Sequence, residues 1–162
     1  MDSTNRVMRT LTDFAVPHLR ILHRQAFSAG QVARESHVPF EAMAKVVVTS
    51  NGRGRYFMAV LPASQRLELA ALERATGVKP LALASEAELG RLFPDCEPGA
   101  MPPFGGPYDM PTFADGSLGR APEIYFQAGR HRETVVMSWA EYERLAAPVI
   151  GHFCQHHRRD AA

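Results

Sequence analysis

The chain has 162 residues, of which 46% are hydrophobic and 22% are charged, a composition typical of an ordinary globular protein. Its formal net charge of +1 excludes a protein that coats nucleic acid through bulk positive charge, although a local basic patch is compatible with it. No apolar run reaches the length of a membrane span, and the N-terminus lacks the apolar core of a signal peptide, which predicts one cytoplasmic domain over residues 1–162 without a membrane partner.

The first half of the chain predicts short helices that alternate with strands. Ser28, followed by Gln31 three residues later, is typical of a helix N-terminus. Asn51 and Gly52 separate two runs rich in β-branched and aromatic residues, which indicates a hairpin because this pair tolerates positive φ. The patterns predict helices over residues 6–15, 28–37 and 63–77, and strands over 18–23, 45–50, 55–62 and 80–84.

The second half contains a segment that regular secondary structure cannot accommodate. Residues 94–111 hold six prolines and three glycines, and such a long loop within one domain is often functional. Serine–glutamate pairs typical of capping boxes open two further helical patterns. The patterns predict helices over residues 85–93 and 138–149, strands over 111–115, 123–128 and 133–138, and a frayed C-terminal tail over 151–162. This mixture predicts a single α+β domain in which helices flank a mixed sheet.

The histidines and cysteines do not predict a metal site or a covalent catalyst. His152, His156 and His157 lie in the C-terminal tail and lack the fixed geometry that a metal site needs. Cys96 and Cys154 are far apart in the sequence and are expected to be free thiols in a reducing compartment. The sequence also contains no P-loop, dinucleotide-binding fingerprint, nucleophile elbow or His-Glu-x-x-His motif. We therefore expect neither a metal nor a cofactor.

Three features can carry chemistry, and each also has a purely structural explanation. Lys45 stands before three valines, where a charge needs a partner or a use, but a lysine at a sheet edge can also extend its ammonium into solvent. Residues 99–105 form a glycine- and proline-rich segment that lets a ligand approach the backbone, or that simply makes a rigid turn. His131 lies between two predicted strands, either as a functional histidine or as an exposed hairpin residue.

These features occur in an order that resembles one family. The segments "VPFEAMAKVVV", "LFPDCEPGAMPPFG", "FADGSL" and "EIYFQAGRHRETVVMSWAEYERL" are similar to the YbaK / prolyl-tRNA synthetase-associated editing domain, from about residue 16 to about residue 148. The remainder, residues 149–162, is then a C-terminal tail. The resemblance implies that family's fold, with a partly barrel-like mixed sheet.

The resemblance also implies an activity and a set of site residues. Members of the family hydrolyse the ester of mischarged tRNA, and a free-standing member acts in trans, here with tRNA for proline carrying a small wrong amino acid as the expected substrate. The family lysine corresponds to Lys45, its Gly-x-x-x-Pro loop to Gly99 and Pro103, and its histidine to His131. Lys45 would contact the terminal phosphate or ribose, or stabilise developing negative charge. The candidate residues around the substrate are Phe27, Ser28, Met43, Ala100, Met101, Pro102, Pro103 and Phe104.

Several alternatives stay open on the sequence alone. Phe27 and Met43 fit core packing as well as a pocket wall. The chain could be a non-catalytic module of the same fold that binds tRNA or an aminoacyl-tRNA synthetase, or a hydrolase of small-molecule esters. DNA is not an expected partner, because the sequence has neither a helix-turn-helix signature nor a basic recognition helix.

Overall fold

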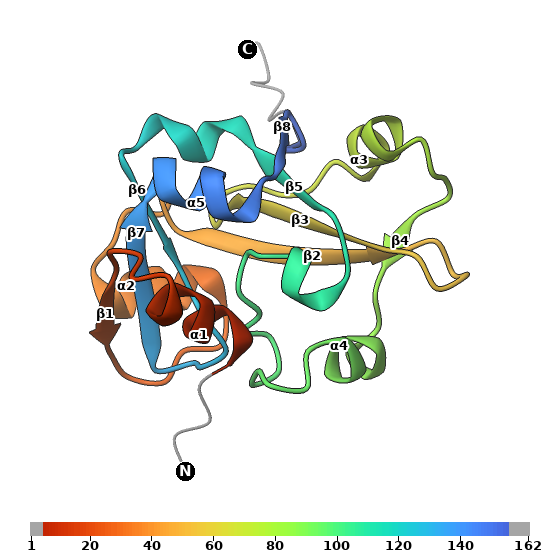
Figure 1. Cartoon of the computed structure of the whole chain (residues 1–162). Coiled ribbons are helices and arrows are strands. Elements are labelled where there is room, and N and C mark those ends of the chain that lie inside the picture. The colour runs from red at the N-terminus through yellow and green to blue at the C-terminus, as the bar shows by residue number, and fades with distance from the viewer. Residues whose placement is uncertain (1–4, 156–162) are drawn as a thin grey trace.

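Two β-sheets form the framework of the structure, a computed structural model that describes residues 5–155 (Figure 1). The first sheet has the strand order β1-β7-β6 and is antiparallel, whereas the second has the order β4-β2-β3-β5-β8 and combines parallel with antiparallel pairs. A bridge between Met43 and Tyr125 joins the two sheets. The strands are β1 (Leu19–Leu22), β2 (Ala44–Ser50), β3 (Tyr56–Pro62), β4 (Ala82–Leu83), β5 (Thr112–Asp115), β6 (Glu123–Phe126), β7 (Glu133–Ser138) and β8 (Val149–Gly151). The predicted α+β fold with a mixed sheet is thereby confirmed.

The helices are short, and they are distributed over both sheets. They are α1 (Arg6–Asp13), α2 (Ala29–Ser36), α3 (Leu69–Thr76), α4 (Glu86–Leu92) and α5 (Trp139–Ala146), with 3₁₀ turns η1 (Gly106–Tyr108) and η2 (Gly116–Arg120). In Figure 1, α3 and α4 lie on opposite sides of the long β2–β3 hairpin, and α1 lies beside the first sheet. No helix within residues 5–155 is long and apolar enough to cross a membrane.

The alternation of side chains along the hairpin separates two hydrophobic clusters. Met58 and Val60 of β3 point into the main core, which α1, α4 and α5 also enter. Phe57 and Leu61 point to the opposite face, where they pack with Leu72 of α3. Lys45 lies directly across from Leu61 on β2 and therefore belongs to this second face. Two clusters on opposite faces leave a sheet that is covered on both sides.

The predicted helix over residues 63–77 is wrong in its first half. The helix begins only at Leu69, because the backbone before it bonds to the C-terminal segment instead. Glu68 N donates to Phe153 O at 2.7 Å, Gln155 N donates to Arg66 O at 2.8 Å, and Leu67 forms a bridge with Cys154. Long-range pairing therefore replaces the helical hydrogen bonds that the local pattern favoured.

The C-terminal tail is ordered as far as it is described, which corrects the prediction that it frays from residue 151. β8 pairs in parallel with β5, and Phe153 is buried against the ring of Phe113 at a centroid distance of 6.0 Å. The helix predicted up to residue 149 ends at Ala146, because Pro148 disfavours helical geometry in the residue before it. The expected strand over residues 80–84 contains only Ala82–Leu83. His156 and His157 lie outside the described residues.

Candidate functional site

The proline-rich loop is held against the β6–β7 connection by backbone hydrogen bonds. Glu97 N donates to Gly129 O at 2.8 Å, and Gly129 N donates to Ala100 O at 2.7 Å. Between these two bonds lies Gly99, whose φ of +84° is in the left-handed region that favours glycine. A Cβ at this position would lie 3.7 Å from Cε1 of His131. The structure thus brings together Gly99 and His131, two residues that the sequence selected independently.

His131 is almost fully buried and uses both ring nitrogens to hold this arrangement. Its Nε2 lies 2.6 Å from Pro98 O, which can only accept, so Nε2 carries the proton in this hydrogen bond. Its Nδ1 faces the Gln127 side-chain amide at 3.4 Å, and its backbone N donates to Glu97 Oε2 at 2.9 Å. The alternative of an exposed hairpin histidine is therefore wrong. The hydrogen bonds of His131 position the loop around Gly99.

Phe27 and Ser28 lie at the rim of this cluster. The Phe27 side chain is 66% exposed and its ring lies 5.1 Å from the His131 ring, centroid to centroid. The Ser28 hydroxyl caps α2 by accepting from Gln31 N at 3.1 Å. Phe27 thus presents an exposed aromatic face beside His131, and Ser28 is the N-cap of α2; that they contact the substrate stays a prediction.

The remaining candidate substrate-binding residues have buried side chains. Met43 is fully buried in a small cluster with Ala26 and Val32, as the core-packing alternative requires. Phe104 packs in the main core against Phe126 and Tyr142. The side chains of the loop that are buried with it are Ala100, Met101, Pro102 and Pro103. In this conformation the exposed part of the loop next to these side chains is Glu97, Pro98 and Gly99.

Within residues 99–104, two backbone amides have no described acceptor. Ala100 N donates to Glu97 O at 3.0 Å, and Phe104 N donates to Pro102 O at 2.9 Å. Among the residues described, the amides of Gly99 and Met101 donate to no protein acceptor. Amides held in fixed directions by prolines can bind a carbonyl oxygen or an oxyanion without a side chain.

Lys45 stands apart from these hydrogen bonds, on the face of β2 that also carries Met43. Its side chain is half-buried, and within residues 5–155 its ammonium forms no hydrogen bond or ion pair. Burial lowers the pKa of Lys45; the nearby Cys154 opposes this effect and the like charge of Arg66 adds to it. An ammonium that is partly desolvated and has no internal counter-ion can stabilise negative charge on a ligand.

The bridge between the sheets places Lys45 and the His131 cluster on the same side of the molecule. On β6, Ile124 and Phe126 enter the main core, so Tyr125 between them points to the opposite face. Tyr125 is bridged to Met43, whose side chain shares a face with that of Lys45 two residues later. The side chain of Gln127, two residues beyond Tyr125, reaches His131. No described contact joins Lys45 directly to Gly99 or His131.

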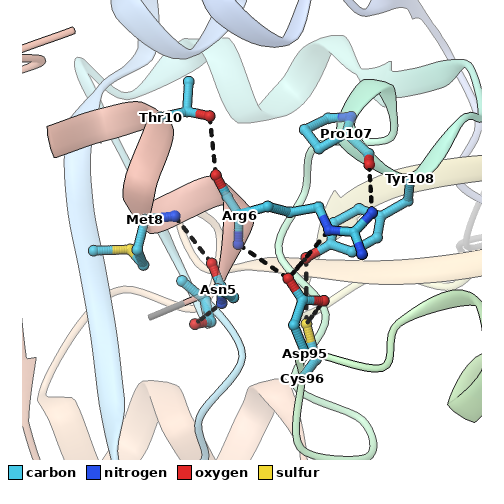
Figure 2. Close-up of polar contacts among 9 residues, drawn as sticks. Asn5, Arg6, Met8, Thr10, Asp95, Cys96, Pro107 and Tyr108 are labelled. Atoms are coloured by element: carbon cyan, nitrogen blue, oxygen red, sulfur yellow. Dashed lines mark hydrogen bonds and ion pairs between the residues drawn. The ribbon is translucent and has the colours of Figure 1, made fainter. Parts of the chain in front are cut away.

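A second polar cluster, which the sequence analysis missed, fastens the same loop to α1 (Figure 2). Asp95 Oδ2 accepts from Arg6 N at 3.0 Å, from Arg6 Nε at 3.3 Å and from the Tyr108 hydroxyl at 3.3 Å. Arg6 also donates through Nη1 to Pro107 O at 2.9 Å, and its guanidinium lies 4.7 Å from the centre of the Tyr108 ring. The cluster ties the beginning of the proline-rich loop to its middle.

The N-cap of α1 extends this attachment to the β6–β7 connection. Asn5 Oδ1 accepts from Met8 N at 2.9 Å, and Asn5 Nδ2 donates to Ala128 O (Figure 2). Asn5 is buried although it lies at the start of the described chain. The sequence offers Asn5 as a helix cap, but no local signal indicates that it also contacts residues more than a hundred positions away.

Within residues 5–155, no three histidine, cysteine or acidic side chains gather in a way that could hold a metal ion. Both cysteines are free thiols. Burial raises the pKa of Cys96 to about 11 and that of Cys154 to about 12, which keeps both thiols protonated near neutral pH. The arrangement offers backbone amides, one free ammonium and a buried histidine, a set suited to binding and polarising an ester.

Comparison with known proteins identifies relatives of this chain. The family model of the aminoacyl-tRNA editing domain matches residues 23–145. The multifunctional Ser/Thr-tRNA deacylase ProXp-y of Escherichia coli (strain K12) is 36% identical over 107 residues, which cover 65% of this chain and 64% of that protein. The chain thus matches just under two thirds of the length of this relative.

Solved structures share the fold. A candidate trans-editing enzyme for prolyl-tRNA synthetase superposes with a TM-score of 0.81 at 21% identity, over 96% of this chain and 99% of that one. A hypothetical protein superposes with a TM-score of 0.83 at 18% identity, over 93% of this chain and all of the other (100%). At these identities the likeness concerns the fold alone.

Proposed function

Because the chain belongs to the aminoacyl-tRNA editing domain family, we propose that it is a deacylase that hydrolyses the ester between a wrong amino acid and its tRNA. The family match over residues 23–145 is the observation that carries this proposal. The substrate is a tRNA bearing a small amino acid, with tRNA for proline as the first choice. The name of the Escherichia coli relative adds seryl- and threonyl-tRNA to the candidates. Such an enzyme acts in the cytoplasm, where charged tRNA occurs, alone or beside a synthetase.

The chemistry needs only a positioned water and stabilisation of the oxyanion that forms when the water attacks the ester carbonyl. The free ammonium of Lys45 supplies positive charge in a partly desolvated setting, either to the oxyanion or to the adjacent phosphate. The free amides of Gly99 and Met101 orient the carbonyl or amino end of the amino acid. His131 is a positioning residue in this scheme, because its ring holds Pro98 and so the direction of the Gly99 amide.

The proposal is tested by single-turnover deacylation of tRNA for proline charged separately with alanine, cysteine, serine and proline, together with seryl- and threonyl-tRNA. We expect rapid release of a small wrong amino acid by the wild-type protein and a loss of at least about 100-fold in Lys45→Ala, the size typical of removing one oxyanion-stabilising group. Lys79→Ala is the matched control, because Lys79 is the only other lysine and is exposed.

Other outcomes would favour the alternative functions. Equal rates for Lys45→Ala and wild type would exclude hydrolysis that depends on this ammonium. Equal hydrolysis of a minimal aminoacyl-adenosine would indicate a small-molecule esterase. Flat time courses on every charged tRNA, combined with measurable tRNA binding, would indicate a non-catalytic module.

A further inference from the structure

A polar pocket of about 450 Å³ lies where the ordered C-terminal segment crosses the second sheet. Its walls come from three separate parts of the chain: Gln65 before α3, Ser117 and Arg120 of η2, and His152 and Cys154 after β8. In Figure 1 these elements meet at the end of the molecule where β8 lies beside β5. The pocket belongs neither to the Gly99–His131 cluster nor to the cluster of Figure 2.

The one carboxylate in the pocket wall is already satisfied internally. Asp115 is 4% exposed and accepts from Ser117 N at 3.0 Å, from Ser117 Oγ at 2.6 Å and from Phe153 N at 2.8 Å. Burial would raise the pKa of Asp115, but these hydrogen bonds outweigh it and leave the pKa below the usual value. The Asp115 carboxylate therefore holds η2 to the C-terminal segment and has little capacity left to bind a cation.

The pocket wall contains one arginine and one histidine, and both are exposed. Arg120 is exposed, and in the part of the chain that the structure describes its guanidinium has no ion pair or hydrogen bond. His152 is likewise exposed in the pocket wall. Arg66 adjoins Gln65, and its carbonyl accepts from Gln155 N. The nearest acidic side chain along this segment, Glu68, is already paired with Arg74 at 3.5 Å.

Lys45 lies next to this pocket, because it is near Cys154, which forms part of the pocket wall. Cys154, in the pocket wall, and Arg66 both lie near enough to Lys45 to influence its pKa. The thiol of Cys154 stays protonated near neutral pH, so it contributes a neutral wall and no negative charge. Lys45, Arg66 and Arg120 therefore present positive charge to one region without a free counter-ion among the described residues.

We propose that this pocket is an anion subsite, in which Arg120 binds a phosphodiester of the unpaired 3′ end of a tRNA, with Arg66 and Lys45 adding positive charge beside the pocket. The inference rests on the proposed function. If Lys45 acts at the ester on the terminal ribose, the nearest anions are the phosphates of the unpaired nucleotides that lead to this ribose. Guanidinium groups match phosphate oxygens in geometry and charge, and water-accessible polar walls suit a hydrated backbone.

The probe is an RNA hairpin that carries no amino acid and has an unpaired 3′ end of four nucleotides. Binding of this probe tests the subsite without requiring hydrolysis. We expect Arg120→Gln to weaken binding roughly tenfold, the size of one charge-assisted contact, and to reduce the slope of log K against log salt by about 0.7. Arg66→Gln should act in the same direction. Arg53→Gln is the matched control, since Arg53 is exposed in the turn between β2 and β3. Arg120→Lys keeps the charge and should keep the slope.

A second probe, the same hairpin without its unpaired end, locates the contact. Here we expect Arg120→Gln and the wild-type protein to bind equally. The subsite is overturned if Arg120→Gln binds the overhanging RNA like wild type, or if it weakens both probes to the same extent. Failure of the deacylase proposal would look different: no charged tRNA would be hydrolysed, whatever the salt slopes are.

Discussion

Gly99 shows how one residue can determine the shape of the candidate site. Gly99 has a positive φ, its neighbours bond to Gly129, the His131 ring lies beside it, and its own amide donates to no described acceptor. A residue with a side chain would have to adopt the left-handed conformation here, which is unfavourable for L-amino acids because of their Cβ. The loop thus depends on the absence of a Cβ more than on any functional group.

We expect Gly99→Ala to lower the free energy of unfolding by roughly 1–2 kcal/mol through backbone strain, and to lower the deacylation rate because the amide shifts. Urea unfolding and single-turnover kinetics measure the two effects. Gly106→Ala is the control, because a Cβ at Gly106 meets no atom within 4 Å and its φ is not in the left-handed region. A Gly99→Ala protein as stable and as active as Gly106→Ala would contradict this role.

At the scale of elements, α1 acts as a brace for the proline-rich loop. Arg6 and Asp95 are 89 positions apart in the sequence, yet their side chains join the first helix to the loop that carries Gly99. Burial would raise the pKa of Asp95, but the Arg6 backbone bond, the Arg6 charge and the Tyr108 hydroxyl outweigh it, and the pKa is lowered. A carboxylate with a lowered pKa in the folded state stabilises the protein above its unfolded pKa and loses this contribution as the pH falls through the folded pKa.

Asp95→Asn should therefore destabilise the protein by roughly 1 kcal/mol at pH 7, and the difference from wild type should shrink below about pH 4. Thermal unfolding across this pH range measures the difference. Asp109→Asn serves as the control, because Asp109 is exposed and asparagine tolerates its φ of 59°. A stability difference that is the same at pH 3 and pH 7 would exclude a role for the Asp95 charge.

For the molecule as a whole, the C-terminal segment completes the second sheet and closes one hydrophobic cluster. Phe153 is 3% exposed, packs on Phe113 and donates its backbone N–H to Asp115. The same segment supplies His152 and Cys154 to the polar pocket. The stability of the hydrophobic cluster that contains Phe57, Leu61 and Leu72 is therefore linked to the shape of the polar pocket.

Phe153→Ala should cost about 3–5 kcal/mol of unfolding free energy, the usual range for removing a buried aromatic ring. The substitution should also weaken RNA binding at the pocket, whereas the conformation of the Gly99 loop should change less. Val149→Ala is the control, since Val149 is 51% exposed on the same segment and should change stability by less than about 0.5 kcal/mol. Denaturant unfolding separates the two variants, and a Phe153→Ala protein as stable as Val149→Ala would show that the segment does not brace the sheet.

The sequence by itself determined the features that depend on neighbours three or four residues apart. The β2–β3 hairpin around Asn51 forms as predicted, and Ser85 and Glu88 make both halves of the capping box of α4. The order of four short motifs also led to the family, because each motif is continuous in the chain. Within the candidate site, it identified Lys45, Gly99 and His131 as unusual residues.

The tertiary structure alone decided which distant segments meet. Residues 63–68 pair with the C-terminal segment instead of extending α3, and the tail forms β8 instead of fraying. Contacts across the fold likewise decide three other features: the contact between Arg6 and Asp95, the burial of residues 100–104 and the pocket around Arg120. Local patterns measure only the preference of a segment for one conformation, whereas these outcomes depend on the free energy gained when particular surfaces are buried against each other.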